Sequence, residues 1–343
     1  MNVSNKDQIR EAHEPHRPTI WVWVAFLVAF FSLDGVIGWA VYREFWWIVV
    51  PLVLVLAHLM HAHTLAFHEA GHKTLCPSKP WNEAIGVFIG TMSLQSLTAF
   101  RGVHHAHHRY LAAENDEELW PFVVPGTPRW VRWLAAVFEL TLGVLYTPML
   151  CFRTFFRANS PVHGRAARRR VWLELAIMVV VWSGIVALTA WFGVWKYLLW
   201  TFVIPGVLAG DMHSLRKYIE HMGLTGSTIL SSTRSIVAHG FVGRLFAFSL
   251  FNINYHGIHH RYAKIPQARL PEFTAMLEPT EQGEVPPYSN YQTAFWEMIR
   301  SLADPRVGAQ WLRREAQEAA AAELVAEPLA SSSPASSAAS SPA

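Results

Sequence analysis

Three short stretches of the chain place histidines at the spacings of metal ligands. Residues 68–72 read HEAGH, so two imidazoles lie one helical turn apart on the same face. Residues 104–108 read HHAHH and residues 256–260 read HGIHH, and the first, fourth and fifth positions of each would share one helix face. Neutral imidazole binds iron, zinc, copper and nickel well. One ion cannot hold all eight side chains, so two ions are predicted at His68, His72, His104, His107, His108, His256, His259 and His260.

The first stretch also fits H-E-x-x-H, in which Glu69 would be the general base of a zinc metalloprotease. An intramembrane protease of that kind would take a third ligand from an aspartate later in the chain, but Leu33–Gly35 precedes the motif. That interpretation also leaves the two later histidine clusters without a role. A histidine-rich metal transporter is a second alternative, but few histidines could lie deep in a membrane: His58, His61 and His63.

The composition indicates that these histidines are carried by a membrane protein. Only 15% of the residues are charged, against roughly 25% in soluble domains, and 52% are hydrophobic. A net charge of +3 gives no reason to expect nucleic acid as a partner. Four segments are apolar enough, and long enough at about 1.5 Å per residue, to cross a hydrocarbon core of about 30 Å. They are residues 20–42, 45–67, 171–192 and 195–212.

Very short turns join these segments in pairs, so the sequence predicts two antiparallel hairpins. Basic residues are frequent before and after each hairpin, whereas the turns carry only Arg43 and Lys196. By the positive-inside rule, both termini and the histidine clusters are expected on the cytoplasmic side. The apolar stretches 84–100 and 134–152 are shorter, and we expect them to be interfacial or re-entrant.

The predicted fold class is therefore all-α, with about four transmembrane helices in two hairpins and a cytoplasmic helical cap carrying a histidine cage. We expect a cytoplasmic N-terminal segment at 1–19, a membrane domain at 20–275 and a cytoplasmic segment at 276–315. Residues 316–343 are rich in Ala, Ser and Pro and lack the apolar side chains of a core, so we expect them to be disordered.

The three histidine motifs, in this order and with paired spans, resemble those of the integral-membrane fatty acid desaturase and hydroxylase superfamily over residues 20–275. The boxes of that family read H-x-x-x-H, H-x-x-H-H and H-x-x-H-H. The resemblance implies that the eight histidines hold a non-haem di-iron centre. Family members often have one more His or Asn ligand between the last span and the third box. Residues 216–221 occupy that position, so His221 is expected to be the ninth ligand.

Other polar residues near these motifs have less defined roles. His61 and His105 are candidates for orienting a ligand from behind, although helix packing or exposure to solvent fits them equally. The acidic run at 115–118 is expected to form a solvated loop, with support of a ligand as the alternative. Asp34 is an intramembrane carboxylate, and we expect it to pack against a polar neighbour in another span.

The resemblance implies an O2-dependent enzyme that removes two hydrogens from an unactivated acyl chain of a lipid. Hydroxylation, ketolation or alkane oxidation within the same superfamily is the alternative. The implied cofactors are two non-haem Fe ions, with O2 as co-substrate. No C-x-x-C motif is present for a fused iron–sulfur or rubredoxin module. Electrons are therefore expected from an external ferredoxin or cytochrome b5-like donor.

Overall fold

The computed structural model describes residues 17–326, and within that range the chain is helical. The one β-type pairing in the described residues is an isolated bridge between Ile236 and Tyr288. The all-α prediction is confirmed. Residues 1–16 and 327–343, for which the sequence predicts a cytoplasmic segment and a disordered tail, lie outside the described residues.

Four helical segments are long and apolar enough to cross a membrane, as the sequence predicts. They are α2 (Arg17–Tyr42), α3 (Trp46–His72), α8 (Arg165–Phe192), and a composite of α9 (Trp195–Leu198), η1 (Leu199–Val203) and α10 (Ile204–His221). Only 11% of the most apolar window of the first span is buried inside the protein. Lipid can cover the remaining apolar surface.

Both hairpins have the expected short turns. α8 ends at Gly193, whose φ of 64° places it in the left-handed region that glycine adopts without strain. The amide of Val194 then donates to the carbonyl of Thr189 at 3.1 Å, which satisfies one of the last carbonyls of the helix. α2 and α3 pack along their length through a buried apolar cluster: Ile37, Ala40, Val41, Val49, Val53 and Leu56.

The fourth span contains a π-helical turn, η1, that the sequence analysis did not predict. Pro205 follows it and has no amide hydrogen to donate to the preceding turn. Within η1, the hydroxyl of Thr201 donates to the carboxylate of Asp34 on α2. The expectation that Asp34 meets a polar neighbour in another span is therefore confirmed.

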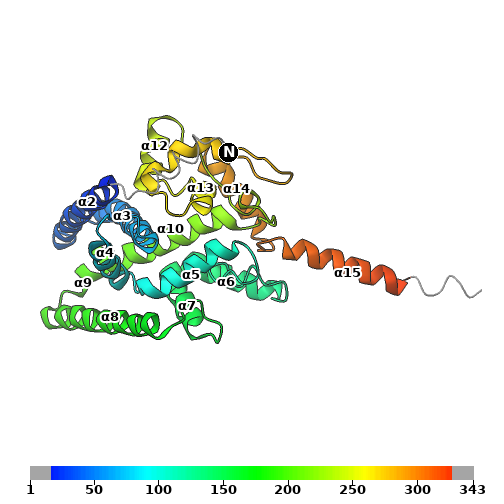
Figure 1. The fold of residues 1–343 in the computed structure, drawn as a ribbon. Helices are drawn as coiled ribbons and strands as arrows, with labels where there is room; N and C mark the ends of the chain where they lie inside the picture. Colours follow the sequence, from blue (N-terminus) through cyan, green and yellow to red (C-terminus); the bar gives the residue numbers. More distant parts are fainter. Residues whose placement is uncertain (1–16, 327–343) are drawn as a thin grey trace, which may run out of the picture.

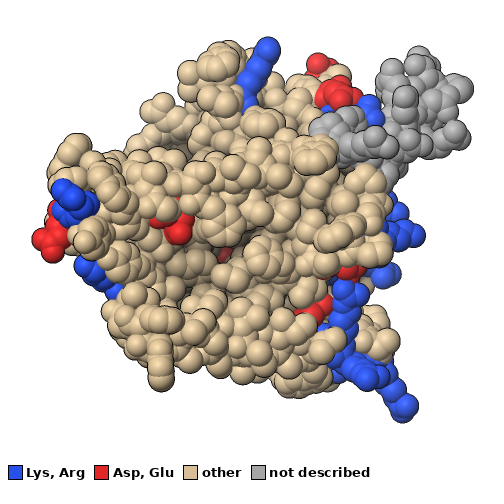
Figure 2. All heavy atoms as spheres, turned by 90° about the vertical axis from the view of Figure 1, so that its left-hand side faces the viewer, with Lys and Arg blue, Asp and Glu red and all other residues tan. Residues whose placement is uncertain are grey.

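The remaining helices follow the two hairpins in the chain (Figure 1). Between the hairpins lie α4 (Lys79–Met92), α5 (Leu97–Tyr110), α6 (Arg129–Thr141) and α7 (Gly143–Phe156). After the fourth span come α11 (Ile229–Ser232), α12 (Gly240–Ser249), α13 (His256–Arg261), the 3-10 segment η2 (Gln267–Leu277), α14 (Tyr291–Ser301) and α15 (Gln310–Ala326). Figure 2 shows a broad face with almost no charged side chains in its middle and with Lys, Arg, Asp and Glu at its margins.

Helix α15 extends into the part of the chain where disorder was expected. It runs to Ala326 and projects away from the other helices (Figure 1). Ala, Glu, Gln and Arg dominate its sequence, and these residues favour helix even where no apolar core is available. Residues up to Ala326 are therefore helical, and the disorder expected from residue 316 remains a prediction for the residues that follow.

Candidate metal centre

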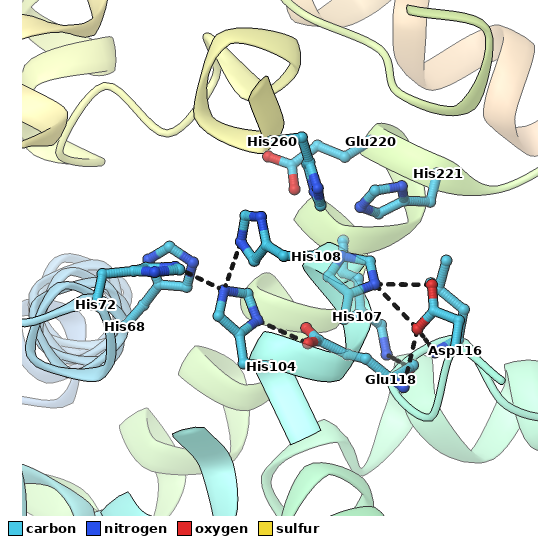
Figure 3. A network of polar contacts seen from close by, with 12 residues as sticks. His68, His72, His104, His107, His108, Asp116, Glu118, Glu220, His221 and His260 are labelled. Atoms are coloured by element: carbon cyan, nitrogen blue, oxygen red, sulfur yellow. Dashed lines mark hydrogen bonds and ion pairs between the residues drawn. The ribbon is translucent and has the colours of Figure 1, made fainter. Parts of the chain in front are cut away.

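All nine histidines predicted as ligands lie together, although they come from four helices. One group brings the ring nitrogens of five histidines within 4.8 Å of one another: His68, His72, His104, His108 and His259. Two overlapping groups share His221: one adds His107 and His260, and the other adds Glu220 and His256. Figure 3 shows the rings from α3, α5 and α10 turned toward one another. The cluster is buried, with His108 the most accessible member.

The helix that carries the second box is fixed at its first turn. The Ser96 hydroxyl accepts a hydrogen bond from the amide of Ala99 at 3.1 Å, which caps α5. The same hydroxyl donates to the carboxylate of Glu174 on α8 at 2.6 Å, and Thr98 donates to that carboxylate with its hydroxyl and its amide. A single buried carboxylate therefore ties the start of α5 to the third span.

Three of the histidines are held from behind through Nδ1. His107 lies 2.8 Å from the carboxylate of Asp116, and His104 lies 2.8 Å from that of Glu118 (Figure 3). His221 on α10 donates to the backbone carbonyl of Ser232 at 3.0 Å. An acceptor at Nδ1 keeps the proton there, so Nε2 of a neutral ring carries a lone pair. These lone pairs point toward the cluster.

The spacing of the Nε2 atoms fits metal coordination. His104 Nε2 lies 2.9 Å from that of His72 and 3.1 Å from that of His108. His256 Nε2 lies 2.9 Å from that of His221 and 3.0 Å from that of His260. For a metal–imidazole bond of about 2.1 Å, neighbouring donors lie about 3.0 Å apart at 90°. Two converging lone pairs repel one another unless a proton or a cation lies between them, and a metal ion can satisfy several of them at once, so these residues fit first-row metal ions.

The charge states in the part of the centre outside the spans suit a cation. Burial lowers the pKa of four rings well below the usual range, and neighbouring histidines add to this: His108, His256, His259 and His260. They are therefore neutral, which is the form that binds metal. Burial opposes ionisation of Glu118, but His104 and His107 hold its pKa well below the usual range. The carboxylate is therefore an anion beside the centre.

The acidic run after the second box is not the solvated loop that the sequence analysis favoured. Asp116 is 1% exposed, and besides His107 it accepts hydrogen bonds from three backbone amides, those of Ala112, Glu118 and Leu119. The side chain of Glu117 turns the other way and pairs with Arg153 of α7 and with Arg157, which directly follows that helix. Asp116 and Glu117 are buried because each carboxylate has its own partners, whereas Asn115 is exposed, so the structure favours the alternative of ligand support over a solvated loop.

Glu69, the residue that a zinc protease would use as its base, has a different contact. It is 1% exposed, and its carboxylate accepts a hydrogen bond from the backbone amide of Gln267 at 3.2 Å. The side-chain amide of Gln267 also lies 3.1 Å from Nδ1 of His68. Glu69 therefore helps to hold η2 against the end of α3.

Neither of the two histidines considered as supports contacts a ring nitrogen of the cluster in the described residues. His105 is exposed, and its ring centroid lies 5.9 Å from that of His72. His61 is 3% exposed, and its ring packs 5.8 Å from that of His213. The structure thus gives His61 a contact between α3 and α10.

A cavity of about 560 Å³ lies among the spans, with a lining that is mostly apolar. α2, α3, α4, α7, α8 and the fourth span all contribute to its wall. On α3 the lining ends at Thr64, four residues or about 6 Å before His68. On α10 it ends at His213, eight residues or about 12 Å before His221. On both helices, the cavity leads toward the histidine cluster.

The fold and site thus define a multi-pass, all-helical membrane protein with a histidine cluster suited to metal. Residues 44–292 match the model of the fatty acid desaturase family. The sphingolipid delta(4)-desaturase DES1 of Drosophila melanogaster is 25% identical over 76% of this chain and 75% of its own length. The sn-1 acyl-lipid omega-3 desaturase (ferredoxin) of a Synechocystis strain is 22% identical over 75% and 73%, respectively.

The family match covers more than half of the chain, so this protein belongs to the fatty acid desaturase family. It is accordingly a desaturase-like oxidoreductase of lipid metabolism. In the sequence analysis, support of a ligand is only the alternative for Asp116 and Glu118, and Glu220 is not predicted to lie at the centre. The first two follow the box within a turn-forming run, and Glu220 immediately precedes a predicted ligand, which are the signals that could have indicated them.

Proposed function

We propose that the protein is an O2-dependent desaturase that removes two hydrogens from the acyl chain of a membrane lipid at a di-iron centre. The ligands would be the nine histidines described above. The observation that carries the proposal is the convergence of Nε2 lone pairs, three of them fixed by acceptors at Nδ1. A merely structural histidine cluster has no need to orient its rings in this way.

The ligand chemistry favours iron. Among the described residues no cysteine joins the cluster, and a donor set of nine imidazoles exceeds the four ligands of a structural zinc site. Breaking an unactivated C–H bond lies beyond acid–base chemistry, so a cofactor must provide the oxidising power. Bound iron with dioxygen would supply that one-electron chemistry.

The chain itself would bind and position the substrate. The apolar cavity can hold an acyl chain, and its wall excludes water along that chain. Because the lining approaches the histidines on both α3 and α10, the depth of the chain in the cavity would select the methylene that reacts. The two relatives are named for sphingolipids and for acyl lipids, and both kinds of lipid carry a long hydrocarbon chain. This supports a lipid substrate of that class.

Electrons would come from a separate protein. The ferredoxin in the name of the Synechocystis relative supports a ferredoxin donor, and a cytochrome b5-like protein is the other candidate. We place the centre and both ends of the chain on the cytoplasmic side. The support is that basic residues flank both hairpins, whereas the turns carry only Arg43 and Lys196.

Lipid analysis of a host that expresses the protein tests this function. Mass spectrometry should detect lipids lighter by two hydrogens, and His107→Ala and His259→Ala should abolish them. His239 is exposed and lies away from the histidine groups, so His239→Ala is the matched control and should keep the product. Lipids that gain one oxygen instead would assign hydroxylation to the centre. An unchanged lipid profile, with the protein present and loaded with iron, would contradict the proposal.

A further inference from the structure

The two overlapping groups that share His221 are here taken together as the second group. This group contains a carboxylate that is not among the nine histidines. Glu220 directly precedes His221 on α10 and is 2% exposed. An oxygen of its side chain lies within 4.8 Å of the ring nitrogens of His221 and His256. Figure 3 shows the carboxylate beside His260 and His221.

The two oxygens of Glu220 have different surroundings. Oε2 accepts a hydrogen bond from the guanidinium of Arg216 and lies 3.4 Å from Nε2 of His256. Oε1 is buried and has no hydrogen-bond partner among the described residues. A buried carboxylate oxygen without a partner is costly, because it loses water and gains nothing in return. This oxygen needs a cation or a donor that the described residues do not provide.

The distances place the carboxylate at a ligand position. Donors bound to one ion at about 2.1 Å lie about 3.0 Å apart at 90° and about 3.4 Å apart at 109°. Oε2 of Glu220 lies 3.4 Å from Nε2 of His256, at the upper end of that range, and the ring nitrogens of His221 and His260 lie 2.9 Å and 3.0 Å from the same nitrogen, close to its lower end.

The composition of the two groups points to the same role. The first group contains five histidines, whereas the second has only four: His107, His221, His256 and His260. We propose that Glu220 is the fifth protein ligand of the second metal ion, so that this ion has four imidazoles and one carboxylate. The inference rests on the proposed di-iron centre and makes its two halves chemically different. An anionic oxygen ligand would stabilise the more oxidised form of the second ion.

The rival role for Glu220 is that of a counter-ion for Arg216 alone. Arg216 is 8% exposed, and Glu220 is its ion-pair partner among the described residues. If pairing were the whole role, Arg216→Gln and Glu220→Gln would disturb the protein similarly, and the double variant would recover because both charges leave together. A ligand role predicts that the double variant still lacks the second ion.

The test compares iron content in wild type, Glu220→Gln, Arg216→Gln and the double variant, each purified with iron and then exposed to a chelator for increasing times. Glu220→Gln and the double variant should lose one of the two ions. The dissociation constant of that ion should rise by more than about 100-fold, which is the largest effect usual for removing a residue that only hydrogen-bonds to a metal ligand. Arg216→Gln should retain both ions. The melting temperature of each variant shows whether it is folded.

A structure of the iron-loaded wild-type protein tests the same point without substitution. A Glu220 oxygen about 2.2 Å from the second ion is the expected result. Two results would overturn the ligand role and leave the di-iron centre intact. One is a wild-type structure with two ions and no Glu220 oxygen within coordination distance of either, and the other is two equally tightly bound ions in Glu220→Gln. A wild-type protein without iron would instead contradict the proposed function.

Discussion

Asp116→Asn is the substitution that tests how the protein orients its metal ligands. Both oxygens of Asp116 accept hydrogen bonds: Oδ2 faces Nδ1 of His107 at 2.8 Å and the amide of Ala112 at 2.9 Å, and Oδ1 faces the amide of Glu118 at 3.1 Å. The side-chain NH2 group of asparagine would face donors on one side, either Nδ1 of His107 and the amide of Ala112 or the amide of Glu118. When it faces His107, the proton moves to Nε2 and the ring no longer presents a lone pair to the centre.

The expected magnitude follows from the contacts that change. Loss of an outer partner of a metal-bound histidine costs about 10–100-fold in metal affinity, or about 1.4–2.7 kcal/mol. Losing a hydrogen bond to a charged group costs about 1.5–3 kcal/mol of folding stability in addition. The assay is the dissociation constant for iron, measured by chelator competition on protein that still shows a cooperative melting transition.

Glu117→Gln is the matched control, because it makes the same chemical change one residue further along the chain. Among the described residues Glu117 pairs with Arg153 of α7 and with Arg157 directly after it, and it contacts no histidine of the centre. We expect it to lower the melting temperature while leaving iron affinity within about threefold of wild type, well below the loss for an outer partner. Equal loss of iron in the two variants would refute the claim that Asp116 acts through His107.

Two further predictions concern the packing around the centre. Burial raises the pKa of the Cys151 thiol to about 12, so this thiol is protonated at pH 8, and maleimide should label Cys76 alone in the folded protein; labelling of both residues would contradict the buried position. A methyl group at Gly210 would overlap the backbone of α7, so Gly210→Ala should destabilise the protein by about 1–3 kcal/mol. Gly206 lines the cavity, where an added Cβ would meet a methionine side chain at 3.4 Å. Gly206→Ala should therefore keep or raise the melting temperature. Equal shifts in melting temperature for the two variants would contradict the close contact between α10 and α7 at Gly210.

The spans and the histidine boxes could be predicted because their signals are local. Apolar runs of sufficient length identify a membrane helix, and histidines at i, i+3 and i+4 share a face whatever else the chain does. His221 was also predicted, although from its place between the last span and the third box. The structure brings it within 4.8 Å of His107 and His260, which the spacing along the chain cannot show.

The supporting residues could not be predicted, because their roles depend on contacts far along the chain. In the sequence, Asp116 and Glu118 fit a solvated acidic loop. Only in the folded chain do Arg153 of α7 and Arg157 directly after it pair with the neighbouring Glu117. Gln267 lies 199 positions from His68, yet the two side chains are 3.1 Å apart. Local patterns of polarity carry no information on such pairs.

The most direct test of the central claim is the metal content per chain of the purified protein, measured together with accurate protein quantitation. We expect about two iron ions per chain and a clear loss of iron in His107→Ala and His259→Ala. One zinc ion per chain, lost on substitution of His68 or His72 but unaffected at His107 and His259, would contradict the account and return HEAGH to the protease interpretation.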